Sequence, residues 1–211
     1  MGRLAEPEIR KLLQKYKIPI VKDVSVKTKE EASKAAEKLG YPVALKVISK
    51  DISHKTEVGG VEVNLKYKHE VEDAFDRICK NMKMHKKTMQ GVLVQQMGHG
   101  YEVIVGGKTD PQFGPTIMFG LGGVWVEAMQ DVSFRVCPLT EKDAEEMVRE
   151  IKGYTILKGF RGKPPADIKS LVEIILNCSK MMAENKIKEF DINPLFVENK
   201  GVLAVDFRMS K

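Results

Sequence analysis

A histidine that precedes a run of polar residues and glycines is the most chemically suggestive feature of the chain. The segment 54–60 reads HKTEVGG and begins with His54. Histidine is the side chain best suited to carry a proton or a phosphoryl group near neutral pH, because its imidazole titrates there. The two closing glycines let the backbone approach a ligand closely. A polar surface turn has the same composition, so the segment by itself leaves both interpretations open.

A lysine interrupts one of the most apolar stretches of the chain. Lys46 lies within residues 42–48, PVALKVI, a nearly continuous apolar run that is typical of a buried strand. Burying an ammonium group is costly unless an anion meets it. Lys46 is therefore either a phosphate-binding side chain that projects from the strand or one whose stem packs while its amine reaches solvent.

The last two predicted strands, residues 187–197 and 202–209, each place polar side chains on one face. Side chains alternate along a strand, so Asp191 and Asn193 share a face that their apolar neighbours do not. The same alternation predicts a single apolar face in the final strand, made by Leu203, Val205, Phe207 and Met209.

The turn between these strands decides which polar residues meet. A two-residue turn at residues 199–200 places Asn193 opposite Asp206. It also places Asp191 opposite Arg208, whereas a longer loop or a bulge would shift the pairing. An amide oxygen and a carboxylate are hard ligands, which suit a Mg²⁺ ion that keeps waters and bridges phosphates. The alternative is a cross-strand polar pair on a solvated face.

Helical and strand patterns alternate around these residues. The periodicity predicts helices at 5–16, 28–39, 69–84, 140–150 and 167–184. Strands are expected at 20–26, 42–48, 61–66, 91–96, 101–108, 116–119 and 132–136, besides the last two. The fold class is thus α/β, or α+β. We expect two lobes with a nucleotide cleft between them: a small lobe over 20–96, and a larger lobe over 97–211 with the helix 5–16.

Composition narrows the class of protein. The chain has 211 residues, of which 43% are hydrophobic and 30% charged, a balance typical of a soluble globular protein. No apolar run approaches the roughly 18 residues of a membrane helix, and no signal peptide is evident, so a cytoplasmic location is expected. The net charge of +6 fits a polyanionic partner. No aromatic residues are interleaved with the basic runs, which disfavours nucleic acid but leaves the partner open.

Nine motifs, taken in order, resemble one family. They are PVALKV (42–47), HKTEVGGV (54–61), VLVQQM (92–97), YEVIVG (101–106), DPQFGP (110–115), FGLGGVWVE (119–127), FRVCPLT (134–140), FDINPL (190–195) and AVDFRM (204–209). Together they resemble the ATP-grasp β subunit of ADP-forming acetyl-CoA synthetases, which are acetate–CoA ligases related to succinyl-CoA synthetase. The resemblance runs from about residue 5 to residue 209, and it implies a single ATP-grasp domain over 1–211.

The resemblance also implies an activity. The family converts acetyl-CoA, ADP and phosphate into acetate, CoA and ATP, with Mg²⁺ and through a phosphohistidine. The chain carries neither a GxGxxG-type CoA-binding domain nor a second histidine motif for the acyl-phosphate step. The implied partner is therefore a CoA-binding α subunit, in an α2β2 assembly, and the implied nucleotides are ATP and ADP.

Family roles carry over by position. His54 would be a second phosphoryl carrier on a mobile loop, and Asp191 would steady the phosphohistidine that the partner brings. Lys46 and Arg135 would contact phosphates, and Lys55 and Thr56 would line the nucleotide site. Gln95, Gln96 and Met97 would contact the adenine, at a place where relatives often carry a glutamate. Glu102 would contact the ribose. Asn193 and Asp206 would be ligands of Mg²⁺.

Two other functions remain open. A stand-alone ATP-grasp ligase, which activates a carboxylate as an acyl phosphate, would share the fold and the metal site but would need no HKTEVGG loop. A basic protein that binds nucleic acid would explain only the net charge of +6.

Overall fold

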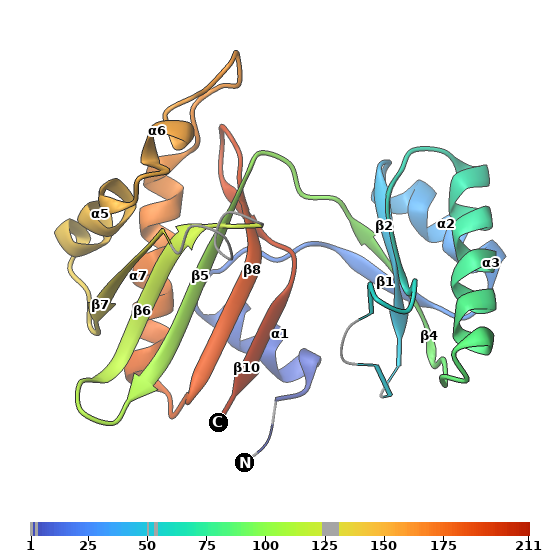
Figure 1. Ribbon diagram of the computed structural model, residues 1–211, viewed down its shortest axis with the longest axis horizontal. Coiled ribbons are helices and arrows are strands. Elements are labelled where there is room, and N and C mark those ends of the chain that lie inside the picture. The colour runs from blue at the N-terminus through green and yellow to red at the C-terminus, as the bar shows by residue number, and fades with distance from the viewer. Residues whose placement is uncertain (1, 3, 50, 53–54, 124–130) are drawn as a thin grey trace. The chain divides into compact units, whose positions relative to one another are not determined.

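The computed structural model describes residues 2, 4–49, 51–52, 55–123 and 131–211 (Figure 1). These residues form two compact units, each with its own core. The small unit is residues 21–97, and the large unit is residues 1–20 together with 98–211. Within the described ranges, no helix is long and apolar enough to cross a membrane.

The small unit is an antiparallel sheet with two helices on one face (Figure 1). The helices are α2 (Lys29–Leu39) and α3 (Lys68–Met84). Thr28 caps the N-terminus of α2. Its hydroxyl accepts the N–H of Glu31 at 3.2 Å, and the Glu31 carboxylate accepts the N–H of Thr28 at 3.3 Å. The strands are β1 (Asp23–Val26), β2 (Val43–Ile48), β3 (Val61–Leu65) and β4 (Gly91–Gln96), in the order β1-β4-β2-β3.

Alternation divides the side chains of β2 and β4 between two faces. Leu45 and Val94 are buried in the core that α2 and α3 cover. Lys46 pairs with Leu93, and Ala44 pairs with Gln95. Opposed residues of an antiparallel pair point to the same side, so Lys46 and Gln95 share the sheet face opposite to the helices.

The large unit is also built on an antiparallel sheet, with the order β10-β8-β5-β6-β7 and β9 paired to β8. Helices α1 (Glu6–Lys15), α5 (Glu141–Glu150) and α7 (Ile168–Glu184) bury their apolar sides in one core with it (Figure 1). A short helix, α6 (Tyr154–Leu157), follows α5. The strands are β5 (Tyr101–Asp110), β6 (Gly114–Leu121), β7 (Val132–Val136), β8 (Glu189–Val197), β9 (Val202–Ala204) and β10 (Phe207–Ser210).

The C-terminal strands pair in the register that the two-residue turn predicts. Arg208 lies opposite Asp191, and the N–H of Asn193 donates to the carbonyl of Asp206 at 3.0 Å. The turn closes where the N–H of Glu198 donates to the carbonyl of Gly201 at 3.0 Å. Gly201 has a φ of +91°, a backbone conformation that glycine adopts without strain.

The prediction of one continuous apolar face in the final strand is wrong. Phe207 and Met209 are buried as expected, but Val202 and Ala204 are buried in place of Leu203 and Val205. The cause is a bulge in β8: its register with β5 shifts at residues 193–194, and the chain between β9 and β10 is irregular at the facing residues 205–206. In β8, and in the facing chain from β9 to β10, the alternation of buried and exposed side chains therefore shifts by one position at the same place. Because both shift together, the residues that pair with each other stay the same.

Candidate functional site

A groove of about 540 Å³ crosses the large unit's sheet on the face opposite to its helices. Residues from five strands line it, including Lys108 of β5, Met118 of β6, Phe134 of β7, Asp191 of β8 and Arg208 of β10. Phe134 is 58% exposed, although it is a large aromatic residue. The groove therefore combines an apolar wall with an acid and a guanidinium, a combination typical of ligand-binding sites.

Asp191 is one of two acidic residues that line this groove, the other being Glu189, and its surroundings disfavour its charge. The side chain is half-buried, and burial is the main reason why the pKa of its carboxyl group is raised. The nearby carboxylates of Asp206 and Glu189 also raise this pKa, whereas the Arg208 guanidinium lowers it. A carboxyl group with a raised pKa in a groove is a candidate for a role in proton transfer or hydrogen bonding.

We expect Asp191→Asn to stabilise the folded chain at neutral pH. The folded chain holds the carboxyl proton more tightly than the unfolded chain, so the group's contribution to stability falls as the pH rises from the ordinary carboxyl range through the raised pKa. Asparagine has nearly the same shape and does not ionise. The measurement is thermal unfolding at pH 4 and pH 7.5. In a chain of this length, a change of 1 kcal/mol in the free energy of unfolding shifts Tm by roughly 2–4 °C. A variant that melts below the wild type at pH 7.5 would contradict this assignment.

Asn193 and Asp206 lie on the irregular part of β8 and its partner, where both side chains are exposed. One oxygen of the Asp206 carboxylate accepts the N–H of Phe207 at 2.9 Å. Among the described residues, no three His, Cys, Asp or Glu side chains come close enough to hold a metal ion by themselves. An amide oxygen and a carboxylate nevertheless fit Mg²⁺, which keeps several waters and takes other ligands from phosphates.

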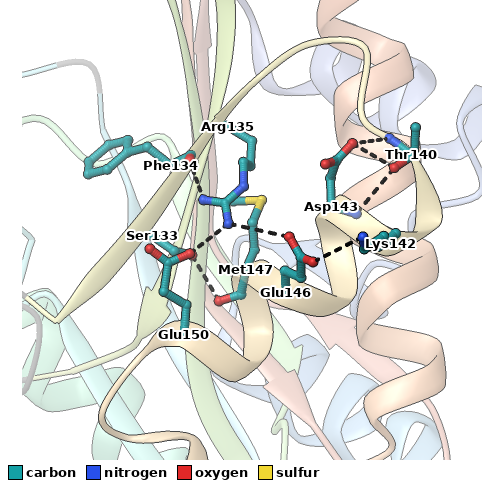
Figure 2. A network of polar contacts seen from close by, with 9 residues as sticks. All are labelled: Ser133, Phe134, Arg135, Thr140, Lys142, Asp143, Glu146, Met147 and Glu150. Atoms are coloured by element: carbon teal, nitrogen blue, oxygen red, sulfur yellow. Dashed lines mark hydrogen bonds and ion pairs between the residues drawn. The ribbon is translucent and has the colours of Figure 1, made fainter.

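Arg135 lies in β7 next to the groove residue Phe134, but it points toward α5 (Figure 2). Its guanidinium donates to the carbonyl of Phe134 at 2.8 Å and forms an ion pair with Glu150 at 2.7 Å. A second carboxylate, that of Glu146, lies 4.0 Å away. The structure thus places Arg135 with the acids of α5 and not with Asp191. A role for Arg135 as a phosphate contact stays a prediction, and it would require the guanidinium to leave Glu150.

Glu102 lies at the start of β5 beside the glycines 120–123. The N–H of Gly122 donates to its carbonyl at 2.7 Å, and a Cβ at position 122 would lie 3.0 Å from its carbonyl carbon. This close approach explains why glycine stands there. The Glu102 side chain is exposed and lines a second pocket of about 560 Å³.

The small unit brings part of the predicted nucleotide contacts together. Lys46 and Gln95 share a sheet face, with Lys46 half-buried and Gln95 buried. The turn that follows residue 54 is tied to the strand of Lys46, because the N–H of Gly60 donates to the carbonyl of Lys55 and the N–H of Val47 donates to the carbonyl of Gly60, both at 2.8 Å.

The other predicted residues of this unit lie at its edges. Thr56 is exposed in the turn, and Gln96 and Met97 are half-buried at the end of β4, where the small unit ends. His54 lies outside the described residues.

Sequence reasoning overlooked the segment that shares the second pocket with Glu102. Phe160, Arg161 and Lys163 follow α6 and line that pocket. Phe160 is 53% exposed and stands between two glycines that take positive φ, Gly159 and Gly162. An aromatic residue between glycines and basic residues was the available clue.

The comparisons with known proteins agree with this architecture. A family model described as an ATP-grasp domain matches residues 1–210, so the fold is an ATP-grasp fold. The β subunit of ADP-forming acetate–CoA ligase I from Pyrococcus furiosus is 46% identical over 210 residues, which cover 98% of this chain and 90% of that subunit. ADP-forming acetate–CoA ligase I from Archaeoglobus fulgidus is also 46% identical, but its matching part is 31% of its length.

Solved structures extend the similarity to three dimensions. The dinucleotide-forming acetyl-coenzyme A synthetase 1 of Ca. Korarchaeum cryptofilum, in complex with coenzyme A, Ca-AMPCP and HgCl⁺, aligns with a TM-score of 0.90 and 43% identity. The alignment covers 98% of this chain and 92% of that chain. The chain therefore belongs to the ATP-grasp family of ADP-forming acetate–CoA ligase β subunits, as the nine motifs indicate.

Proposed function

We propose that this chain is the nucleotide-binding β subunit of an ADP-forming acyl-CoA synthetase. With a CoA-binding partner it interconverts acetyl-CoA, ADP and phosphate with acetate, CoA and ATP. The observation that carries this proposal is the similarity to a ligase β subunit over 98% of the chain at 46% identity. The matching portion of the A. fulgidus ligase is about a third of a longer chain, which supports a partner with the remaining functions.

Each unit carries residues that we propose as nucleotide contacts. Lys46, on the sheet face opposite to α2 and α3, holds phosphates through its ammonium group. Lys55 and Thr56 line the same site, Gln95, Gln96 and Met97 contact the adenine, and Glu102 contacts the ribose. Asn193 and Asp206 supply oxygen ligands to Mg²⁺, which neutralises phosphate charge when it is bound. A related structure that contains Mg-AMPPCP supports this choice of ion.

Phosphoryl transfer rests on His54 and Asp191. The imidazole of His54 accepts a phosphoryl group that comes from the partner's phosphohistidine and passes it to ADP. Asp191 accepts a hydrogen bond from the ring N–H of the incoming phosphohistidine and fixes the orientation of that ring. In the related Korarchaeum structure with Mg-AMPPCP, a phosphohistidine segment points towards the nucleotide-binding site, which supports such a transfer. An α2β2 assembly in the cytoplasm completes the proposal.

Reconstitution tests this function. The full chain is mixed with a CoA-binding α subunit of this family, in the presence of acetyl-CoA, ADP, phosphate and Mg²⁺, and ATP is measured over time. We expect ATP only when both proteins are present. Carboxylate ligation by the chain alone would support the stand-alone ligase instead. Retention on RNA or DNA that falls steeply with salt, without nucleotide binding, would support the nucleic-acid function.

A further inference from the structure

Two basic side chains, those of Arg161 and Lys163, line the second pocket of the large unit and have no role in the proposed function. Glu102 contributes its carboxylate to this pocket of about 560 Å³. The segment 158–166, which follows α6, contributes Phe160, Arg161 and Lys163. The remaining lining residues are Gly100, Tyr101, Leu121, Gly122, Gly123 and Ile156.

The segment is anchored to the strand that carries Glu102. The hydroxyl of Tyr101, the first residue of β5, donates to the carbonyl of Pro164 at 3.0 Å. The N–H of Ala166 donates to the carbonyl of Leu157 at 2.8 Å and closes the base of the segment. The same strand therefore positions the carboxylate and holds the segment that bears the cations.

Each cation lies beside an aromatic ring at the pocket. The Arg161 guanidinium is 5.3 Å from the centre of the Phe160 ring, and the Lys163 ammonium is 5.9 Å from the centre of the Tyr101 ring. Such contacts are worth roughly 0.5–1 kcal/mol at exposed sites, so they restrict the cations without neutralising them. The pocket thus presents two cationic hydrogen-bond donors and one carboxylate acceptor.

We propose that Arg161 and Lys163 are specificity-determining residues that bind the ribose diol of the nucleotide together with Glu102. A hydroxyl group both donates and accepts hydrogen bonds, whereas a carboxylate only accepts and the two cations only donate. A vicinal diol satisfies both kinds of group at once. A phosphate would meet the Glu102 carboxylate, whose charge repels it. The exposed Phe160 ring supplies apolar surface for the sugar or the base.

Nucleotide affinity without catalysis tests this inference, which rests on the proposed function because it assumes that the site binds a nucleotide. The full chain is titrated with ADP and with 2′-deoxyADP, in the presence of MgCl₂, by calorimetry. We expect the wild type to bind ADP about tenfold more tightly, because 2′-deoxyADP lacks a hydrogen bond to a charged group. Arg161→Ala and Lys163→Ala should each weaken ADP binding by about the same factor and weaken 2′-deoxyADP binding less, because 2′-deoxyADP keeps only one of the two hydroxyls.

Two further variants separate the possible failures. Arg149→Ala removes an exposed arginine of α5 that is paired with Glu145, and it should change neither affinity. Lys46→Ala removes a proposed phosphate contact, so it should weaken both nucleotides equally. If Arg161→Ala and Lys163→Ala bind ADP as the wild type does, the inference is overturned and the proposed function stands. A wild type that binds neither nucleotide would overturn both.

Discussion

Replacing His54 by asparagine is expected to abolish ATP formation by the complex of this chain with its CoA-binding partner. Asparagine keeps a polar side chain but has no nucleophilic ring nitrogen, so the phosphoryl group has no carrier on this chain. Loss of a covalent carrier should lower the rate about a thousandfold or more. The measurement is ATP produced from acetyl-CoA, ADP and phosphate by the reconstituted complex.

The expectation combines the sequence with the turn that follows residue 54. The turn at residues 55–60 is joined to β2, the strand that carries Lys46, by the hydrogen bond from the N–H of Val47 to the carbonyl of Gly60. In the sequence, His54 directly precedes this turn.

The matched control is His85→Asn, which changes an exposed histidine at the end of α3. It should leave the rate unchanged, and both variants should bind ADP as the wild type does. A second measurement traces the phosphoryl group itself: acid-labile phosphate should appear on the wild type and the His85 variant but not on the His54 variant. Full turnover by the His54→Asn complex would eliminate the carrier role.

Local chemistry predicted the C-terminal pairing but not the direction of every side chain. Asn199, Lys200 and Gly201 form a turn signal that lies entirely within the sequence, and the register follows from it. The bulge at residues 193–194 depends instead on pairing with β5, which is about ninety positions earlier in the chain. Pro194 indicates an irregularity in β8. It does not show that the alternation of buried and exposed side chains would also shift at the facing residues 205–206.

Long-range contacts also explain why the sequence did not predict the surroundings of Arg135, Arg161 and Lys163. Arg135 resembles a phosphate contact by position, yet its partners Glu146 and Glu150 lie on a helix that packs beside its strand. Arg161 and Lys163 had no assigned role, because their connection to Glu102 exists only once the segment after α6 is fixed by Tyr101. The order of the motifs along the sequence was sufficient to identify the family. In contrast, the pocket that Glu102 shares with Arg161 and Lys163 forms only when the chain folds.

Asp206→Ala is expected to lower the affinity for Mg-ADP about a hundredfold while it changes fold stability little. Removing a ligand that helps to hold a metal typically weakens the site by one to two orders of magnitude or more. The side chain is exposed, and surface substitutions usually change stability by less than about 0.5 kcal/mol. The measurements are calorimetric titrations of ADP with and without MgCl₂, and urea unfolding of both proteins.

The donor set sharpens this expectation. Since Asn193 and Asp206 offer only two side-chain oxygen ligands, Mg²⁺ should bind tightly only together with nucleotide phosphates. The loss in Asp206→Ala should therefore vanish when Mg²⁺ is omitted. The matched control is Glu189→Ala, which removes another exposed carboxylate from the same strand pair and should keep the Mg²⁺ dependence. If Asp206→Ala binds Mg-ADP like the wild type, Asn193 and Asp206 are a structural pair and the ion is held elsewhere.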